Sequence, residues 1–370
     1  QLECSYSLAG GRCVGVPQGG LCEGAFCTSG VSCTRTYHVR AGAGAGGDGS
    51  AGAPLSRLVD AASQAVSGDC IALAAGSYSP ATLAGGVSLL GAGADSVTIS
   101  VGAATGASPL PPALTVKGGS GGVLRGFTIS GEGRGLFVSK TANLRLEQLR
   151  VTRTREIGIE VSGATGLSIR TLEIDAIARG PAGADGAGLV VVAGADVSVD
   201  LSAMVGAASQ GVLVSESRVA LRDTLVQQCG EHGVAVMCST DPRCQTSLAS
   251  SLTDVTLLRN KGSSLLLFGA RVSGARVEID SPRFMGARRI ARGIEAQAHN
   301  NQQAHLELDS STIRDSAGEG AVLDRTTGKL ANTTIRDSGD RGVWVQGLDS
   351  GALLLKNNQV LDNSWAGIGA

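Results

Sequence analysis

Short stretches in which apolar and polar residues alternate recur from about residue 123 to the end of the chain. Alternation with a period of two indicates β-strands. At its most regular the same pattern returns after 22 residues, as between Ile313 and Ile335. The apolar residue that ends the first strand of each repeat falls at Ile129, Val151, Ile174, Val205, Val226, Leu257, Ile279, Ile313, Ile335 and Val360.

Each repeat predicts three short strands. A second apolar run follows the first, as in GVLVS and GVWVQ, and a third follows in segments such as LSIRT and VALRD. A strand residue advances about 3.3 Å, so three strands and their turns close one triangular coil. Stacked coils pair each strand with its counterpart and enclose one apolar core. We therefore predict an all-β, right-handed parallel β-helix, a three-sheet solenoid of about 22 residues per coil. A leucine-rich horseshoe is disfavoured, because its repeat string is absent.

The pattern divides the chain into three regions. Residues 1–36 form a Cys-rich disulfide module, residues 37–122 the entry and first coils, and residues 123–370 the regular coils. Within the entry, apolar residues at helical spacing predict one capping helix over about 55–66, with Gly68 just past its end. The last coil stops within its second strand, so we expect a partner chain or further sequence to cover it, with fraying of this coil as the alternative.

The nine cysteines predict disulfides and an oxidising compartment. They lie among Gly, Ser and Pro without paired Cys-x2-Cys knuckles, which favours disulfides over a metal site. Cys238–Cys244 is the favoured pair, because it closes one insertion, and the odd count leaves one cysteine over. We expect an extracellular or cell-surface protein, with the periplasm as the alternative. The cysteines are Cys4, Cys13, Cys22, Cys27, Cys33, Cys70, Cys229, Cys238 and Cys244.

The entry segment resembles a known family. From Tyr37 to Ser79 the order is a strand, a Gly/Asp loop, a proline, a helix, Gly-Asp-x-Ile and Gly-x-Tyr. This order is similar to the start of pectin-lyase-like β-helix proteins, and the resemblance covers residues 37–370. Their repeats are like those of carbohydrate-binding proteins and sugar hydrolases. The resemblance implies the fold, but the superfamily includes lyases, hydrolases, epimerases, adhesins and structural spikes. Residues 1–36 resemble small Cys-rich modules of secreted proteins.

The outward positions of the second strands predict an interface. Most are apolar, although a sheet that is apolar on both faces is normally covered. We expect the Cys-rich module, a loop, another chain or an apolar partner to pack there, with scattered single exposures as the alternative. The predicted interface residues are Phe137, Val190, Leu213, Leu266, Val322, Trp344 and, in the last coil, Trp365.

The candidates for catalysis lie in and beside the insertions. Long insertions flank the second strands and predict a cleft beside them, with Asp280, Arg288, Glu295 and His299 as its candidate residues. Arg283, Arg288, Arg289 and Arg292 form a basic cluster suited to a carboxylate or sulfate. No aspartate pair recurs on neighbouring second strands, and Glu160 and Glu295 lie about 24 Å apart by coil spacing. This distance is too long for a glycosidase carboxylate pair.

Three aspartates recur at one turn of successive coils. Asp315, Asp337 and Asp362 each follow an Arg or a Leu after the first strand, where Asp can bond the turn's own backbone. Calcium bridging this column is the weaker alternative, and we expect no other cofactor.

Net charge and hydropathy limit the classes of partner that the protein can have. The formal charge of −1 argues against nucleic acid, and no apolar run is long enough to span a membrane. Partners are therefore another protein chain, a surface assembly or an extracellular polysaccharide. We predict a structural, adhesive or assembly role through the second-strand face or the last coil. The alternative is a polysaccharide lyase or glycoside hydrolase.

Overall fold

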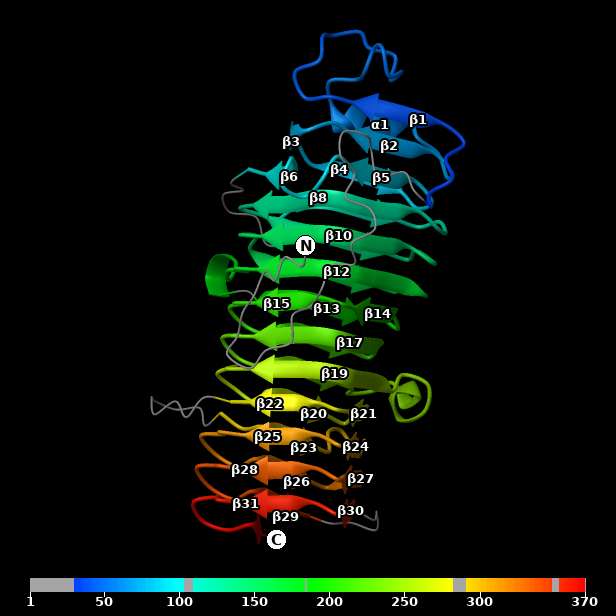
Figure 1. The fold of residues 1–370 in the computed structure, drawn as a ribbon. Helices are drawn as coiled ribbons and strands as arrows, with labels where there is room; N and C mark the ends of the chain where they lie inside the picture. The colour runs from blue at the N-terminus through cyan, green and yellow to red at the C-terminus, as the bar shows by residue number, and fades with distance from the viewer. Residues whose placement is uncertain (1–29, 103–108, 184, 282–290, 348–352, 370) are drawn as a thin grey trace.

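The computed structural model describes residues 30–102, 109–183, 185–281, 291–347 and 353–369. It is a right-handed parallel β-helix, a column of stacked coils with helix α1 (Leu58–Gln64) near its N-terminal end (Figure 1). Within these residues the strands form one sheet of 20 and one of 12, and every pairing between named strands is parallel. The predicted fold class is confirmed.

The smaller sheet contains the second strand of each coil. Its strands are β4 (Ala81–Ala84), β7 (Pro112–Lys117), β9 (Arg134–Ser139), β11 (Glu156–Ser162), β13 (Gly186–Val192), β16 (Val212–Ser215), β18 (Val234–Met237), β20 (Leu265–Phe268), β23 (Ile294–Gln297), β26 (Ala321–Asp324), β29 (Val343–Gln346) and β32 (Ile368–Gly369).

The larger sheet contains the first and third strands. It comprises β1 (Thr36–Val39), β2 (Cys70–Leu73), β3 (Gly76–Tyr78), β5 (Ser88–Gly91), β6 (Val97–Val101), β8 (Val123–Gly131), β10 (Arg145–Thr152), β12 (Leu167–Asp175), β14 (Asp196–Asp200), β15 (Ala203–Val205), β17 (Arg218–Gln227), β19 (Ser250–Leu258), β21 (Arg271–Ala275), β22 (Glu278–Asp280), β24 (Ala304–Asp309), β25 (Thr312–Arg314), β27 (Thr326–Ala331), β28 (Thr334–Arg336), β30 (Leu353–Lys356) and β31 (Gln359–Leu361). Two short 3-10 helices, η1 (Pro181–Gly183) and η2 (Pro242–Gln245), lie in insertions.

One bent residue separates the third strand of a coil from the first strand of the next. In β10 this residue is Gln148, with φ of 52°, and in β19 it is Asp254, with φ of 53°. A single left-handed residue turns the chain while the ladder of hydrogen bonds continues on both sides. The larger sheet is therefore folded into a first-strand face and a third-strand face.

The repeated aspartates occupy the corner after the first strand. Asp315, Asp337 and Asp362 have φ of 56°, 57° and 52°. Asp and Asn tolerate this left-handed conformation better than most residues, because their short side chains bond local backbone. Just inside the corner, Asn363 Oδ1 accepts a hydrogen bond from the Ser338 amide at 3.0 Å.

The capping helix is shorter than the predicted span of 55–66. Leu55 forms a parallel bridge with Val39, which holds it in an extended conformation before the helix starts. Leu58 and Ala61 face the core, whereas Val59 and Val66 are exposed. Within the described residues no helix is long and apolar enough to cross a membrane.

Candidate functional site

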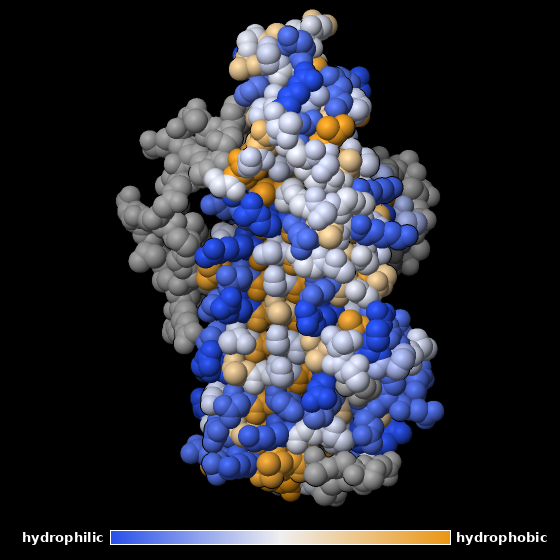
Figure 2. Space-filling model, turned by 90° about the vertical axis from the view of Figure 1, so that its right-hand side faces the viewer, coloured by the Kyte–Doolittle hydropathy of each residue, from blue (hydrophilic) through white to orange (hydrophobic). Residues whose placement is uncertain are grey.

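The third-strand face is a shallow trough. Figure 2 shows the side on which β14, β21, β24, β27 and β30 lie in Figure 1. Hydrophobic residues are visible along its middle, between hydrophilic residues. The outward residues of its central column are in register from coil to coil, and most are short. They are Arg145, Ser168, Ser198, Ala220, Ser251, Ser273, Glu307, Lys329 and Leu354.

A hollow of about 220 Å³ lies in this trough. The outward residues on β19 and β21 are too short to fill the space above the sheet, so the surface is hollowed there. Longer polar residues of β24 and β27 border it towards the C-terminal end. The residues around the hollow are Ser251, Leu252, Thr253, Ser273, Gly274, Ala275, Glu307, Leu308, Asp309 and Lys329.

His305 links two coils beside this hollow. Its Nε2 lies 2.8 Å from Glu307 Oε1, and its Nδ1 lies 2.9 Å from Thr327 Oγ1. An Arg271 guanidinium nitrogen lies 3.7 Å from the same carboxylate oxygen. The hydrogen bond from His305 lowers the pKa of the Glu307 carboxyl. Glu307 is therefore ionised at neutral pH and already has cationic and donor groups around it.

Asp309 is held in the same way. Its Oδ1 accepts from Asn332 Nδ2 at 2.8 Å, and its Oδ2 accepts from Ser310 Oγ at 2.9 Å. The hydrogen bond from Asn332, followed by that from Ser310, lowers the pKa of the Asp309 carboxyl. Neither carboxyl at the hollow has the raised pKa that a general acid needs at neutral pH. The trough offers hydroxyls and carboxylates that already accept hydrogen bonds.

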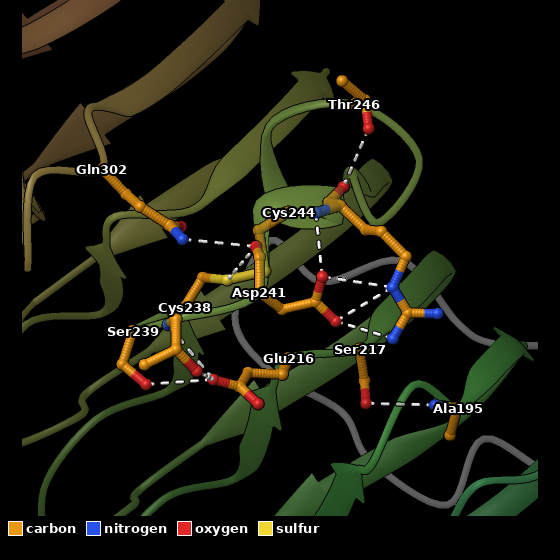
Figure 3. A network of polar contacts seen from close by, with 11 residues as sticks. Ala195, Glu216, Ser217, Cys238, Ser239, Asp241, Cys244, Thr246 and Gln302 are labelled. Carbon is orange, nitrogen blue, oxygen red and sulfur yellow. Dashed lines mark hydrogen bonds and ion pairs between the residues drawn. A yellow bond between two sulfur atoms is a disulfide. The ribbon is translucent and has the colours of Figure 1, made fainter.

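A disulfide-closed loop stands between the second strands and this trough. Cys238 and Cys244 are bonded, with their Cα atoms 6.2 Å apart, and Asp241 caps η2 by accepting from the Arg243 amide at 2.9 Å (Figure 3). Gln302 Nε2 donates to the Asp241 carbonyl at 3.3 Å, which ties the loop to the insertion two coils further on.

Glu216 anchors the loop from the coil before it. Its Oε1 accepts from Thr240 Oγ1 at 2.8 Å and from Ser239 Oγ at 3.0 Å. These bonds, that from Thr240 first, lower the pKa of the Glu216 carboxyl. The disulfide and these hydrogen bonds therefore hold the loop in place beside the trough.

The second-strand face carries the predicted interface column in register. Val190, Leu266 and Val322 are only 6%, 5% and 2% exposed, while Phe137, Leu213 and Trp344 are half-buried. Ion pairs interrupt the column, with Arg134 Nη1 2.6 Å from Glu160 Oε2 and Arg292 Nη1 3.0 Å from Glu295 Oε1. The face is filled with side chains, and its role as an interface stays a prediction.

The three candidate catalytic residues that the structure describes lie on different parts of the coil. Asp280 ends β22 on the first-strand face, where Arg314 Nη2 lies 3.1 Å from its Oδ2, and burial raises the pKa of this carboxyl. Glu295 lies on the second-strand face and accepts from Ser263 Oγ at 2.5 Å. His299 lies in the turn after β23, edge-on to Phe268 with ring centroids 5.5 Å apart. Arg288, like Arg283 and Arg289, lies outside the described residues.

The predicted cysteines and calcium ligands are placed as follows. Cys33 is bonded to Cys70, and Cys229 is free and buried, with its pKa raised to about 12 by burial. Cys4, Cys13, Cys22 and Cys27 lie outside the described residues. In the described part of the chain, no group of three His, Cys, Asp or Glu residues is placed to hold a metal ion, and this includes the Asp315, Asp337 and Asp362 column.

The last coil exposes apolar side chains. Leu354, Leu361, Trp365 and Ile368 are all exposed. A cavity of about 240 Å³ is lined by Ile335, Val343, Leu355, Asn357, Asn358, Val360 and Ile368. An interface at this coil remains a prediction.

Comparison with known proteins supports the fold. No family model and no curated protein matches the sequence. Among solved structures, the chain is similar to the Azotobacter vinelandii mannuronan C-5 epimerase AlgE4 A-module, with TM-score 0.59, 17% identity, and 84% of this chain and 90% of that chain covered. The chain has the pectin-lyase-like β-helix fold.

Two further structures share this fold with different functions. The GH136 lacto-N-biosidase from Eubacterium ramulus has TM-score 0.59 at 10% identity, covering 89% of this chain and 68% of that one. The Streptococcus pneumoniae surface protein and adhesin PfbA has TM-score 0.51 at 11% identity, covering 84% and 94%. The fold therefore serves both enzymes and an adhesin, and the choice between them depends on this chain's own residues.

The sequence predicted a cleft beside the second strands. The trough on the third-strand face was not predicted. The relevant signal was present as a column of small outward residues, such as Ser198, Ala220 and Ser273, on successive third strands. A single small residue does not indicate a site, but small residues stacked in register leave a hollow.

Proposed function

We propose that the protein is a secreted or cell-surface β-helix that binds a neutral polysaccharide along its third-strand face without cleaving it. The observation that carries this proposal is the hollow over Ser251 and Ser273, with Glu307 and Lys329 at its border. The Cys33–Cys70 and Cys238–Cys244 disulfides support an oxidising, extracellular setting.

The trough suits an extended chain of sugars. The outward positions from Ser168 to Lys329 follow one another over six rung spacings of about 4.8 Å, about 29 Å in all. A repeating ligand can meet equivalent hydroxyls on successive coils. Apolar atoms between the serines suit the C–H faces of sugar rings, and the fixed loop around Cys238–Cys244 limits access from one side.

Neutral sugars fit the trough well, because the carboxylates at the hollow already accept hydrogen bonds from neighbouring side chains. Glu307 is bonded to His305, and Asp309 to Asn332 and Ser310. Binding a strong anion or cation here would break these contacts, whereas sugar hydroxyls can share them. The comparisons agree at a coarser level, since the similar structures include carbohydrate-active enzymes and a surface adhesin.

Titration of the full chain with soluble neutral polysaccharides by calorimetry tests the proposal. We expect saturable binding of at least one glucan, mannan or xylan. Ser273→Phe fills the hollow and is expected to weaken binding at least 10-fold. Thr312→Phe is the matched control, because it places the same side chain outward on the first-strand face. Failure of every neutral polysaccharide to bind, or equal affinities of the two variants, would overturn the proposal.

One observation favours an enzyme as the second candidate. Thr327, His305 and Glu307 form a hydrogen-bonded chain of hydroxyl, imidazole and carboxylate, an order in which histidine acts as a base for a hydroxyl in known hydrolases. Incubation with neutral and uronate polysaccharides, with and without calcium, distinguishes the candidates. New reducing ends or unsaturated products that disappear in His305→Ala would establish the enzyme and end the non-cleaving proposal.

A further inference from the structure

Both tryptophans of the chain lie against one arginine in the last two coils. Arg341 Cζ is 4.7 Å from the centre of the Trp344 ring and 4.3 Å from the centre of the Trp365 ring. Aromatic residues make up only 3% of the sequence, and it contains two tryptophans in total. Their convergence on one guanidinium therefore separates this spot from the rest of the surface. We call these three residues the Trp–Arg clamp.

The coil geometry builds the clamp. Arg341 ends the turn before β29, and Trp344 points outward from that strand three residues later. Trp365 lies in the equivalent turn one coil on, where its amide donates to the Asp340 carbonyl at 3.3 Å. Glycine at position 369 allows the Arg341 side chain to pack against the backbone, because a Cβ there would lie only 2.8 Å from Arg341 Cδ. Backbone contacts from both coils thus position the three side chains.

Arg341 has no carboxylate partner among the described residues. Its neighbours in the fold differ, since Arg314 pairs with Glu278 and Asp280, and Arg336 pairs with Asp337. Glu319, at the equivalent position one coil earlier, is bound by Arg292 at 3.0 Å. The Arg341 guanidinium contacts two indole rings by cation–π interaction. Since no carboxylate of the described residues pairs with it, its N–H groups can donate to a ligand.

Trp365 supplies an apolar surface beside these N–H groups. It is 72% exposed, and one side of its ring is directed at the guanidinium. An exposed indole beside an unpaired guanidinium combines a surface for the C–H face of a sugar ring with a two-point donor for an oxyanion.

We propose that the Trp–Arg clamp binds an anionic sugar. The sugar's carboxylate or sulfate pairs with the N–H groups of Arg341, and its ring packs on Trp365. This site lies on the second-strand side, away from the trough on the third-strand face, and takes a charged ligand. It is therefore independent of the proposed binding of neutral polysaccharide.

Intrinsic tryptophan fluorescence tests the clamp directly, because both tryptophans lie in it. We would titrate the full chain with a uronate oligosaccharide, a sulfated oligosaccharide, a neutral oligosaccharide of equal length and sodium sulfate. The expected result is a saturable change with one or both acidic sugars. The neutral sugar and sulfate alone are expected to leave the emission unchanged at the same concentrations.

Variants separate the parts of the clamp. Arg341→Gln is expected to weaken acidic-sugar binding at least 10-fold, and Arg341→Lys to recover part of it. Trp365→Ala is expected to weaken it about 3- to 10-fold by calorimetry. Arg336→Gln is the matched control, because it removes an arginine of the same coil that is already ion-paired, and it should bind normally. Thermal unfolding verifies that each variant is folded.

Three outcomes overturn the clamp proposal. These are an absence of any fluorescence change with both acidic sugars, equal binding by Arg341→Gln, and binding of sodium sulfate as tight as that of the sugars. None of these outcomes affects the neutral-polysaccharide titration, so the two proposals fail separately.

Discussion

The second-strand and third-strand faces rise from the same coils but present opposite surfaces. In one coil, Val190 points outward from β13 and is buried, whereas Ser198 points outward from β14 and is exposed. The backbone ladder is parallel on both faces, so the two surfaces differ in the side chains that they carry. The comparison shows that, on a regular solenoid, small residues in register leave a hollow on the surface.

The largest expected effect concerns the core that both faces share. Ile335 is fully buried and stacked between Ile313 and Val360. We expect Ile335→Ala to lower the free energy of unfolding by about 2–5 kcal/mol, because it leaves a cavity. The outward neighbour Thr334→Ala should stay within about 0.5 kcal/mol. Urea unfolding measures both, and similar losses would show that the inward and outward assignments are wrong.

Exchanging residue types between the two faces tests the comparison itself. Val190→Ser removes a buried side chain and leaves a hydroxyl there, so we expect a loss of about 1–3 kcal/mol. Ser198→Val on the other face of the same coil should change stability by less than about 0.5 kcal/mol. Thermal and urea unfolding of the two variants give the answer, and equal effects would mean that the faces do not differ in packing.

The corners limit what either face can tolerate. Asp337 has φ of 57°, a conformation that costs a β-branched residue about 1–2 kcal/mol. Asp337→Val should therefore destabilise the protein by about that amount, whereas Asp337→Gly should be near neutral. If the two variants unfold at the same urea concentration, the corner is not left-handed in solution.

The smallest expected effect is on how the free energy of unfolding falls at acid pH. The folded-state pKa values of Glu307 and Asp309 are lowered by their hydrogen bonds. Such groups stabilise the fold fully above their unfolded pKa, about 4.3 for Glu and 3.9 for Asp, and this contribution is lost as pH falls through the folded pKa. Glu307→Gln with Asp309→Asn should make stability fall less steeply below about pH 4. An unchanged slope between wild type and variant contradicts this assignment.

The sequence predicted the coil and its corners because both depend on local pattern. Alternation and the 22-residue spacing of Ile313 and Ile335 indicated the stacked strands, and their register is observed. The merged third and first strands were not predicted, because a single left-handed residue such as Gln148 carries no turn signature. The capping helix was drawn too long, because Leu55 fits the helical spacing but pairs with Val39.

The candidate site was harder to predict for a physical reason. The chain of Thr327, His305 and Glu307 joins two coils, so it becomes visible only when the register is known. The clamp likewise joins Trp344 to Trp365 through Arg341. The sequence indicated both tryptophans as interface residues but carried no sign of the arginine between them.

Hydroxyl-radical footprinting tests the central claim most directly, because it maps a bound polysaccharide onto the two faces. The tightest neutral ligand from the calorimetric titrations would be used at saturation. We predict that His305, beside the hollow, is protected, while Met237 and Phe268, on the second-strand face, react as in the free protein. Protection of Met237 and Phe268 with His305 unchanged would contradict the account and move the binding surface to the second strands.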